Sequence, residues 1–326
     1  MKIAKAINVF LGRPLLILMY HRFTENNNEG FALKACDFEK QLRFIRRIYT
    51  IVALEEYFDL TEEQRNRIVN PAAITVDDGY MNFYQYGYPI LKKLSLPATV
   101  YLPADFIENG KWMWQDRNKY ILRNTSKQQV HFNWETDEYI LPLKTSFDLL
   151  KSMEIVYALC MKEPNGRREF FSQSLAKSAD VQLPEMPDEE FAPLTWEKIK
   201  KMENNRIYFG SHTMNHEILT EMDSSQALEE IMGSKKFIES RLSHEIKGFC
   251  YPNGCYNVQI AKQVEICGYR YAVTTEKGLN SRSDSMMCLR RPSSPESGTC
   301  FDILRGCCWR PVKDLVKSKM KERIWT

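Results

Sequence analysis

Two short stretches of this 326-residue sequence combine residue types that bind a metal ion and move protons. The stretch Thr75-Val76-Asp77-Asp78-Gly79-Tyr80 places two carboxylates after an apolar run, and consecutive side chains point in different directions. One carboxylate can therefore bind a metal while its neighbour accepts a proton. The stretch Ser211-His212-Thr213-Met214-Asn215-His216 holds two of the five histidines. Histidines four residues apart fall on one side of a helical turn, within reach of one cation.

Each stretch also has a plainer interpretation when it is taken alone. Most Asp-Asp-Gly tripeptides are solvated turns, and a pair of histidines four apart is usually a surface feature. Two further clusters also have both a structural and a functional interpretation. Phe249-Cys250-Tyr251-Pro252-Asn253-Gly254 contains a turn signature, and it is either a simple loop or the source of a backbone oxyanion donor. Tyr20-His21-Arg22 ends the first apolar run, where a lone histidine is more often structural than catalytic.

The segments around these clusters alternate between short apolar runs and amphipathic stretches, which is typical of a parallel α/β fold. Asp37 is the expected cap of a helix through residue 45, and Asp223 with Gln226 predicts a capping box for a helix reaching Leu242. A further helix is expected at 86–94. The predicted strands are 15–20, 72–76, 98–102, 206–210, 247–251 and 271–274. Each cluster follows one of these strands, at the edge where the loops of such folds form an active site.

Residues 106–190 break this rhythm and predict an inserted subdomain. Trp112 and Trp114 within it could stack on a bound ligand, although a place in the core of the subdomain is the better expectation. The segment 131–139 alternates in the manner of a strand. On either side of this subdomain we expect the two parts of one barrel, at 1–105 and 191–310. A basic C-terminal helix is expected at 311–326.

Composition narrows the class of protein. A hydrophobic content of 44% supports a substantial core. A net charge of +3, without a basic run interleaved with aromatics, gives no basis for nucleic-acid binding. The nine cysteines lack zinc-knuckle spacing, and a chain this long does not need disulfides, so we expect reduced thiols and a cytoplasmic location.

The two ends of the chain raise the question of membrane contact. Lys2 and Lys5 precede an apolar stretch, but Arg13 and Pro14 interrupt it and no signal-peptide cleavage pattern follows. Two basic amphipathic segments could lie on an anionic membrane, although packing against the barrel explains them equally well. These segments are residues 1–11 and 312–325.

Taken together, the motifs resemble those of the polysaccharide deacetylase (NodB-homology) family. Residues 73–80 are similar to its first motif, 210–216 to its second and 249–254 to its third. The order and spacing also agree, as do residues 232–236 and 268–275. The resemblance covers about 15–105 and 191–295 and leaves out the insertion.

The resemblance implies a distorted (β/α) barrel with one divalent metal, most often zinc. It implies that Asp78, His212 and His216 are the metal ligands, that Asp77 is the catalytic base and that the Asn253 amide is the oxyanion donor. The implied reaction removes an N-acyl group, most often acetyl, from an aminosugar. The substrate would be a polysaccharide or oligosaccharide, and a lipid-linked glycan intermediate is one version of it.

The chain departs from the family pattern in two places. Better-known members carry a base-orienting arginine in the third motif, where this chain has Cys250. Arg290 and Arg291 near the last expected strand could replace it, and Arg290 is the candidate we name. The last motif of those members supplies a histidine as general acid, and no histidine follows His244 here.

His21 is our candidate for that missing acid. It is the one remaining histidine at a strand end on the predicted active edge, and an imidazole titrates near neutral pH. A purely structural His21 is an equal alternative.

Three other functions share part of this chemistry. A glycosidase needs carboxylates about 5 to 10 Å apart across the scissile bond, which adjacent aspartates suit poorly. A catalytically silent sugar-binding homologue would bind glycans without turnover. A deformylase of a lipid-linked aminosugar would keep the mechanism and change the acyl group. The last two remain open from the sequence.

Overall fold

The computed structural model describes residues 14–25 and 32–292 of the chain. Its strands are β1 (Leu16–Tyr20), β2 (Phe23–Thr24), β3 (Leu33–Lys34), β4 (Thr50–Ile51), β5 (Pro71–Val76), β6 (Ala98–Leu102), β7 (Gln129–Trp134), β8 (Asp137–Pro142), β9 (Ile207–Ser211), β10 (Gly248–Cys250) and β11 (Tyr271–Val273). Its α-helices are α2 (Ala35–Ile45), α3 (Leu54–Asp59), α4 (Glu62–Arg67), α5 (Tyr88–Leu94), α6 (Ala104–Asn109), α7 (Trp114–Asn124), α8 (Ser146–Cys160), α9 (Arg168–Ala179), α10 (Trp196–Glu203), α11 (Ser224–Leu242) and α12 (Val258–Ile266). Short 3-10 or π turns are η1 (Phe83–Gly87), η2 (Asn165–Arg167), η3 (Leu219–Glu221) and η4 (Pro252–Gly254).

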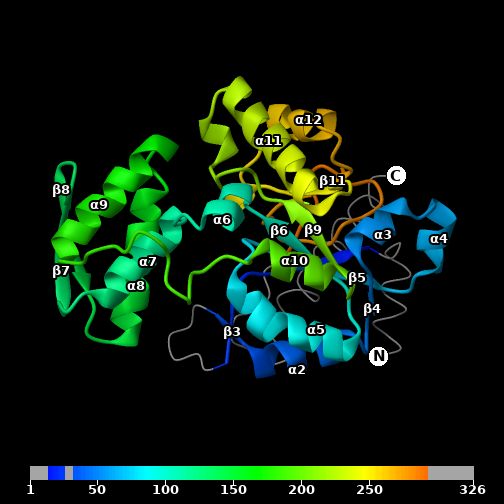
Figure 1. Ribbon diagram of the computed structural model, residues 1–326, viewed down its shortest axis with the longest axis horizontal. Helices are drawn as coiled ribbons and strands as arrows, with labels where there is room; N and C mark the ends of the chain where they lie inside the picture. The colour runs from blue at the N-terminus through cyan, green and yellow to red at the C-terminus, as the bar shows by residue number, and fades with distance from the viewer. Residues whose placement is uncertain (1–13, 26–31, 293–326) are drawn as a thin grey trace, which may run out of the picture. The chain divides into compact units, whose positions relative to one another are not determined.

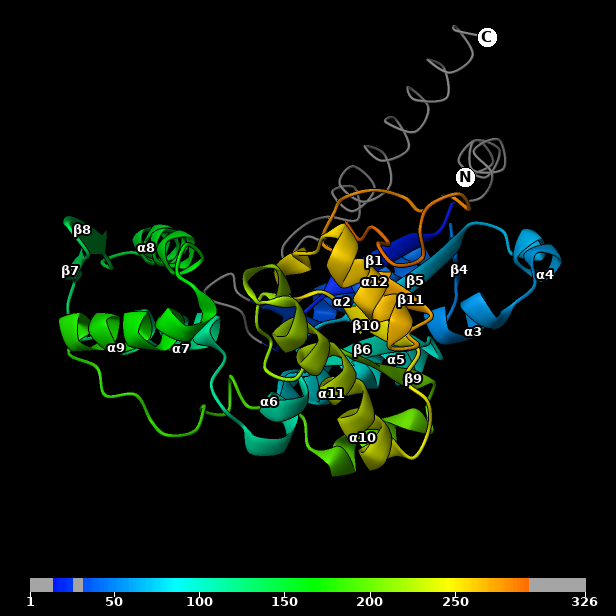
Figure 2. The ribbon, with the colours of Figure 1, turned by 90° about the horizontal axis from the view of Figure 1, so that it is seen from above.

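The main sheet is parallel and runs in the order β1-β5-β6-β9-β10-β11, with β4 pairing alongside the start of β5. Its strands are almost wholly buried, because helices such as α5, α11 and α12 cover the outside (Figures 1 and 2). The sheet curls into a partial barrel. This confirms the predicted distorted (β/α) barrel with an inserted subdomain, and all six predicted strands are present.

The two edge strands of the sheet are linked by the segment from 279 to 291. Leu15 and Asn280 exchange backbone hydrogen bonds of 2.8 and 3.0 Å beside β1. At the other edge, Thr274 donates to the carbonyl of Leu289, which lies parallel to Val273. This segment therefore brings the last described residues to the carboxyl ends of the strands.

Two tyrosine rings fill the interior of the barrel where glycines leave room for them. A Cβ on Gly210 would lie 2.5 Å from the ring of Tyr101, and a Cβ on Gly248 would lie 2.4 Å from the hydroxyl of Tyr271. The hydroxyl of Tyr271 donates to the buried carboxyl group of Glu55 at 2.6 Å. Burial raises the pKa of Glu55 to about 7, although the bond from Tyr271 opposes the rise. A packed core therefore supports the strand ends that carry the candidate site.

The helix ends test two capping predictions. Asp223 caps α11, and its capping box with Gln226 is present as predicted. The prediction for Asp37 was wrong: α2 begins at Ala35 after Lys34, and Asp37 lies in the first turn, where it accepts from Lys40. The helix expected at 86–94 is preceded by η1, so regular α-helix begins only at Tyr88.

The chain folds into two compact units, and the smaller one is Asn109–Ala192. It contains α7, α8 and α9 with an antiparallel hairpin of β7 and β8. The segment whose alternation predicted one strand is thus divided between two, because the chain turns at Glu135 (φ 54°). Trp112 and Trp114 are both buried, as expected of core residues.

No helix in the described part of the chain has the length and apolar character needed to cross a membrane. The six cysteines within the same ranges form no disulfide. The amphipathic segments predicted at 1–11 and 312–325, and with them the basic C-terminal helix predicted at 311–326, lie outside the described residues.

Candidate metal and catalytic site

The adjacent aspartates follow β5 directly, and their side chains diverge. The backbone N–H of Asp77 donates to the Tyr20 carbonyl at 2.9 Å, so this residue continues the sheet. Asp78 and Gly79 then take left-handed conformations, with φ of 72° and 67°. A Cβ on Gly79 would lie 2.8 Å from Leu102, so a residue without a side chain is needed there. The turn sends Asp77 and Asp78 toward different partners.

The two histidines lie on an irregular loop after β9 and not on a helical turn. The N–H of His212 donates to the Leu102 carbonyl at 2.9 Å, which ties the start of the loop to β6. Thr213 and His216 have positive φ values of 65° and 57°. The two imidazoles lie close together, as predicted. Two residues with left-handed backbone conformations bring them together, and not a helical turn.

Asp78 and both histidines converge on one buried point. Oδ1 of Asp78 lies 3.5 Å from Nε2 of His212 and 3.4 Å from Nε2 of His216. The two imidazole rings are 4.6 Å apart between centroids, edge to face. Ligands about 2.1 Å from a tetrahedral metal lie about 3.4 Å from one another, so the spacing fits a shared cation.

The hydrogen bonding of His212 supports the same conclusion. Its Nδ1 lies 2.8 Å from the carbonyl of Cys250, and a carbonyl only accepts, so Nδ1 carries the proton. The Nε2 lone pair is then turned toward Asp78. Burial lowers the pKa of His212 and favours the neutral ring. Two groups with lone pairs therefore face each other in a buried place, and a cation between them satisfies both.

The charge state of Asp78 suits a ligand as well. Burial alone would raise the pKa of this carboxyl group, but the imidazoles of His212 and His216 beside it outweigh burial and hold the pKa well below its usual range. The carboxylate is therefore ionised at neutral pH. Two imidazoles and one carboxylate form a donor set that suits zinc and leaves coordination positions open.

Asp77 is held by a buried arginine. Oδ1 and Oδ2 of Asp77 each accept a 2.7 Å bond from Arg291, through Nη1 and Nη2. The other N–H groups of Arg291 are also used. They reach the Thr274 carbonyl at 2.9 Å, the Thr75 hydroxyl at 3.0 Å and the Cys250 sulfur at 3.1 Å. All five guanidinium donors thus have acceptors, which offsets the cost of burying the charge.

The arginine that contacts Asp77 is therefore Arg291 and not Arg290, the candidate named from the sequence. Neighbouring residues in an extended segment point to opposite sides. Arg291 turns into the barrel, whereas Arg290 turns outward and pairs with Asp284 at 3.1 Å. Only the pairing of this segment with β11 decides which of the two faces inward.

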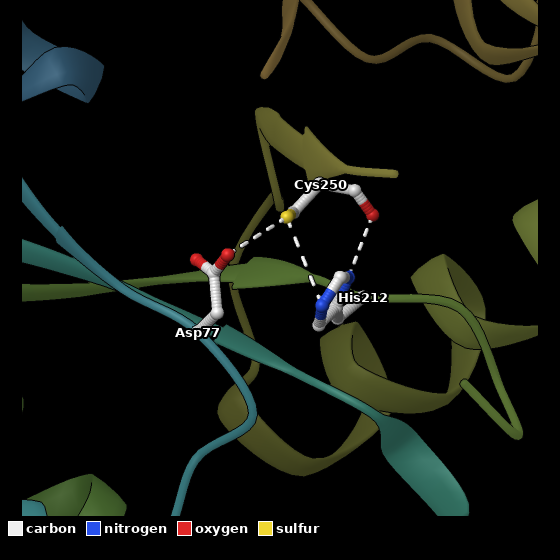
Figure 3. A group of neighbouring side chains, drawn as sticks. All are labelled: Asp77, His212 and Cys250. Carbon is white, nitrogen blue, oxygen red and sulfur yellow. Dashed lines mark hydrogen bonds between the residues drawn. The ribbon is translucent and has the colours of Figure 1, made fainter. Parts of the chain in front are cut away.

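Cys250 occupies the space between Asp77 and His212, as Figure 3 shows. Its sulfur lies 3.5 Å from Oδ2 of Asp77 and 3.8 Å from Nε2 of His212. These three groups could form a second metal set. Arg291 already supplies a positive charge at this place, and burial raises the pKa of the Cys250 thiol well above its usual value. A neutral thiol beside a guanidinium group is a poor cation site, so the set with Asp78 is the better one.

The protonation of Asp77 follows from the same contacts. Burial alone would raise its pKa, but the positive charge and hydrogen bonds of Arg291 lower it below the usual value of 3.8. Arg291 donates to two of the four lone-pair positions of the carboxylate, and the Cys250 thiol donates to a third, on Oδ2. One lone pair on Oδ1 remains available for a proton.

His21 and Asn253 lie on neighbouring loops. Nε2 of His21 is 3.8 Å from Oδ2 of Asp77, and its side chain is 43% exposed, so solvent can reach it. Asn253 lies in η4 with φ of 53°, and its carbonyl accepts from the Thr275 hydroxyl at 3.2 Å. The other described histidines lie elsewhere, since His131 contacts Glu138 and His244 contacts Glu203.

Replacing Arg291 with methionine tests its hold on Asp77. Burial is then unopposed, so the pKa of Asp77 should rise, and NMR of its carboxyl carbon against pH measures that rise. Breaking a buried ion pair should also lower the free energy of unfolding by about 3–5 kcal/mol. Arg290→Met is the matched control, and its partly exposed pair should cost no more than about 1 kcal/mol. An unchanged pKa of Asp77 in Arg291→Met would show that Arg291 does not set the charge of Asp77.

Comparison with known proteins agrees with this geometry. A family model described as polysaccharide deacetylase matches residues 143–272, a range that includes the histidine loop and η4. YxkH of Bacillus subtilis (strain 168), a candidate polysaccharide deacetylase by its name, is 24% identical over 291 residues. That alignment covers 88% of this chain and 74% of YxkH.

Solved structures share the fold. The Streptococcus pyogenes deacetylase PplD, in complex with acetate, matches with a TM-score of 0.61 and 18% identity, over 90% of this chain and 98% of PplD. IcaB from Ammonifex degensii matches with a TM-score of 0.59 and 16% identity, over 91% of this chain and 98% of IcaB. The chain therefore resembles polysaccharide deacetylases in part of its sequence and in its fold, and these comparisons together indicate a hydrolase of the deacetylase class.

The family model differs in extent from the resemblance found in the motifs. It begins at residue 143, within the expected insertion, and does not reach the first motif. The place of Asp77 and Asp78 in the site therefore rests on the geometry. Their strand, β5, pairs with β6, and β6 pairs with β9, which leads into the histidine loop.

Proposed function

We propose that this protein removes an N-acyl group, acetyl in the first instance, from an aminosugar unit of a glycan, with the help of a divalent metal. The convergence of Asp78, His212 and His216 at 3.4–3.5 Å in a buried place carries the proposal. When bound, the metal would lower the pKa of a water molecule and polarise the acyl carbonyl. Zinc is the ion we propose, because two imidazoles and a carboxylate suit it.

Asp77 is proposed as the general base. It is ionised at neutral pH, it is adjacent in sequence to the ligand Asp78, and Arg291 fixes its orientation through two bonds. A positioned base of this kind would accept the proton of the attacking water. The backbone N–H of Asn253 is proposed to stabilise the oxyanion, on the basis of the motif and of its place after β10.

His21 is proposed as the acid that protonates the departing amine. Its position 3.8 Å from Asp77 and its partial exposure place it where a leaving group can be reached. His21→Gln should keep its metal and lose the alkaline limb of the kcat/KM profile, with a fall in rate of about 10² to 10⁴-fold. If His21→Gln keeps the alkaline limb and a near-normal rate, the role of His21 is structural. Metal content measured on the same sample shows that the site itself is intact.

The substrate proposal rests on the family and on its relatives. PplD, which shares the fold, is a deacetylase whose structure holds acetate. We therefore propose an N-acetylated polysaccharide or oligosaccharide as substrate, with a lipid-linked glycan as one form to be tested. The membrane contact that a lipid-linked substrate would need is examined by co-sedimentation with anionic liposomes at low salt.

Metal analysis of the purified protein, coupled to acyl release, tests the whole proposal. N-acetylhexosamine oligomers and lipid-linked glycans are incubated with metal-free and zinc-loaded protein, and acetate and formate are both measured. The proposal expects zinc-dependent acetate release. Formate release would identify a deformylase. Glycan binding without any release in the zinc-loaded protein would identify a silent sugar-binding homologue and overturn the proposal.

A further inference from the structure

A buried carboxylate on α11 holds the loop that carries the histidines. Oε2 of Glu230 accepts from two consecutive backbone N–H groups, those of Met214 and Asn215, at 2.9 Å each. Oε1 of the same carboxylate accepts from Nδ2 of Asn215 at 2.6 Å. The three bonds all lead to the segment between His212 and His216. Glu230 is buried, and no lysine, arginine or histidine of the described residues pairs with it.

The loop requires such support because its backbone is unusual. Thr213 is β-branched and has φ of 65°, a conformation that such residues rarely adopt, and His216 has φ of 57°. The carbonyls of Thr213 and Met214 accept from the first two N–H groups of α6, at 3.1 and 2.8 Å. The hydroxyl of Thr213 accepts from the N–H of His216 at 3.0 Å. The carbonyls are thus fixed from one side by α6, and the amides from the other side by Glu230.

We propose that Glu230 is a positioning residue that sets the affinity of the site for its metal. It acts by holding residues 213–216 in the conformation that aims His216 at Asp78. The inference rests on the proposed function, because it assumes that Asp78, His212 and His216 bind the metal. Groups that orient metal ligands in this way typically account for about 10–100-fold in metal affinity.

Glu230→Gln tests the proposal with little change in volume. The glutamine keeps one oxygen and presents an NH₂ group to at least one loop donor, so it cannot accept all three bonds. The zinc Kd, measured by chelator competition, should rise about 10–100-fold. Glu229→Gln is the matched control on the same helix, since Glu229 is exposed, and its Kd should stay within about twofold of wild type. A loss of melting temperature with an unchanged Kd would show that Glu230 is merely structural and overturn the inference.

A second measurement needs no variant. In metal-free wild-type protein, the amide hydrogens of Met214 and Asn215 should exchange as slowly as those within β9, because Glu230 already accepts them. Exchange at the rate of an unstructured peptide would overturn the inference even if Glu230→Gln failed to fold. Wild-type protein that binds no zinc would overturn the proposed function. Wild-type protein that binds zinc together with a Glu230→Gln variant of equal Kd would overturn the inference alone.

Discussion

His216→Ala should yield a folded protein that binds no stoichiometric zinc and releases no acetate. The substitution removes one of the two imidazole nitrogens that lie 3.4–3.5 Å from Oδ1 of Asp78, and the two remaining groups offer too few ligands for a stable site. His212→Ala should have the same effect on metal and activity. The cleaner test is His216, because His212 also bonds the Cys250 carbonyl and its loss disturbs β10.

Elemental analysis measures the metal content of each variant. The near-ultraviolet circular dichroism spectrum shows whether the variant is folded. His244→Ala is the matched control, because that histidine lies on the surface and contacts Glu203. It should keep full metal and activity. Full zinc occupancy in both His212→Ala and His216→Ala would refute the ligand assignment.

Asp77→Asn should keep the metal and lose most of the turnover. Asparagine retains the size of the side chain but cannot take a proton from water, and general-base catalysis typically contributes about 10² to 10⁴-fold. The metal should remain, because Asp77 turns toward Arg291 while Asp78 faces the histidines. A fall in kcat/KM of less than tenfold, with metal intact, would exclude the role of Asp77 as base.

The same variant predicts a change in acid stability. The pKa of Asp77 in the folded protein lies below its usual value of 3.8, so the carboxylate stabilises the fold above the usual carboxyl range. That contribution is lost as the pH falls through the folded-state pKa. The free energy of unfolding of Asp77→Asn should therefore depend less steeply on pH in acid than that of wild type. Chemical denaturation at several pH values between neutrality and the acid range provides the measurement.

Local sequence patterns determined the scaffold of this protein. Apolar runs such as residues 72–76 and 98–102 predicted buried parallel strands, because both faces of such a strand lie against other elements. Asp223 and Gln226 predicted the start of α11, because a capping box depends on residues only three positions apart. The metal-ligand candidates could likewise be found, since they lie in the loops that follow two strands of the barrel, β5 and β9.

The tertiary structure alone decided how these groups are held. Arg290 and Arg291 are chemically identical in the sequence, and only the pairing of their segment with β11 turns Arg291 inward to Asp77. Asp37 seemed a cap because its residue type suits one, yet α2 begins two residues earlier.

Glu230 could not be recognised from the sequence, because its partners Met214 and Asn215 lie on a distant loop. Hydrophobic periodicity and capping are properties of neighbouring residues, so a sequence displays them directly. The orientation of a buried charge depends on contacts between residues far apart in the chain, and these contacts exist only once the barrel has formed.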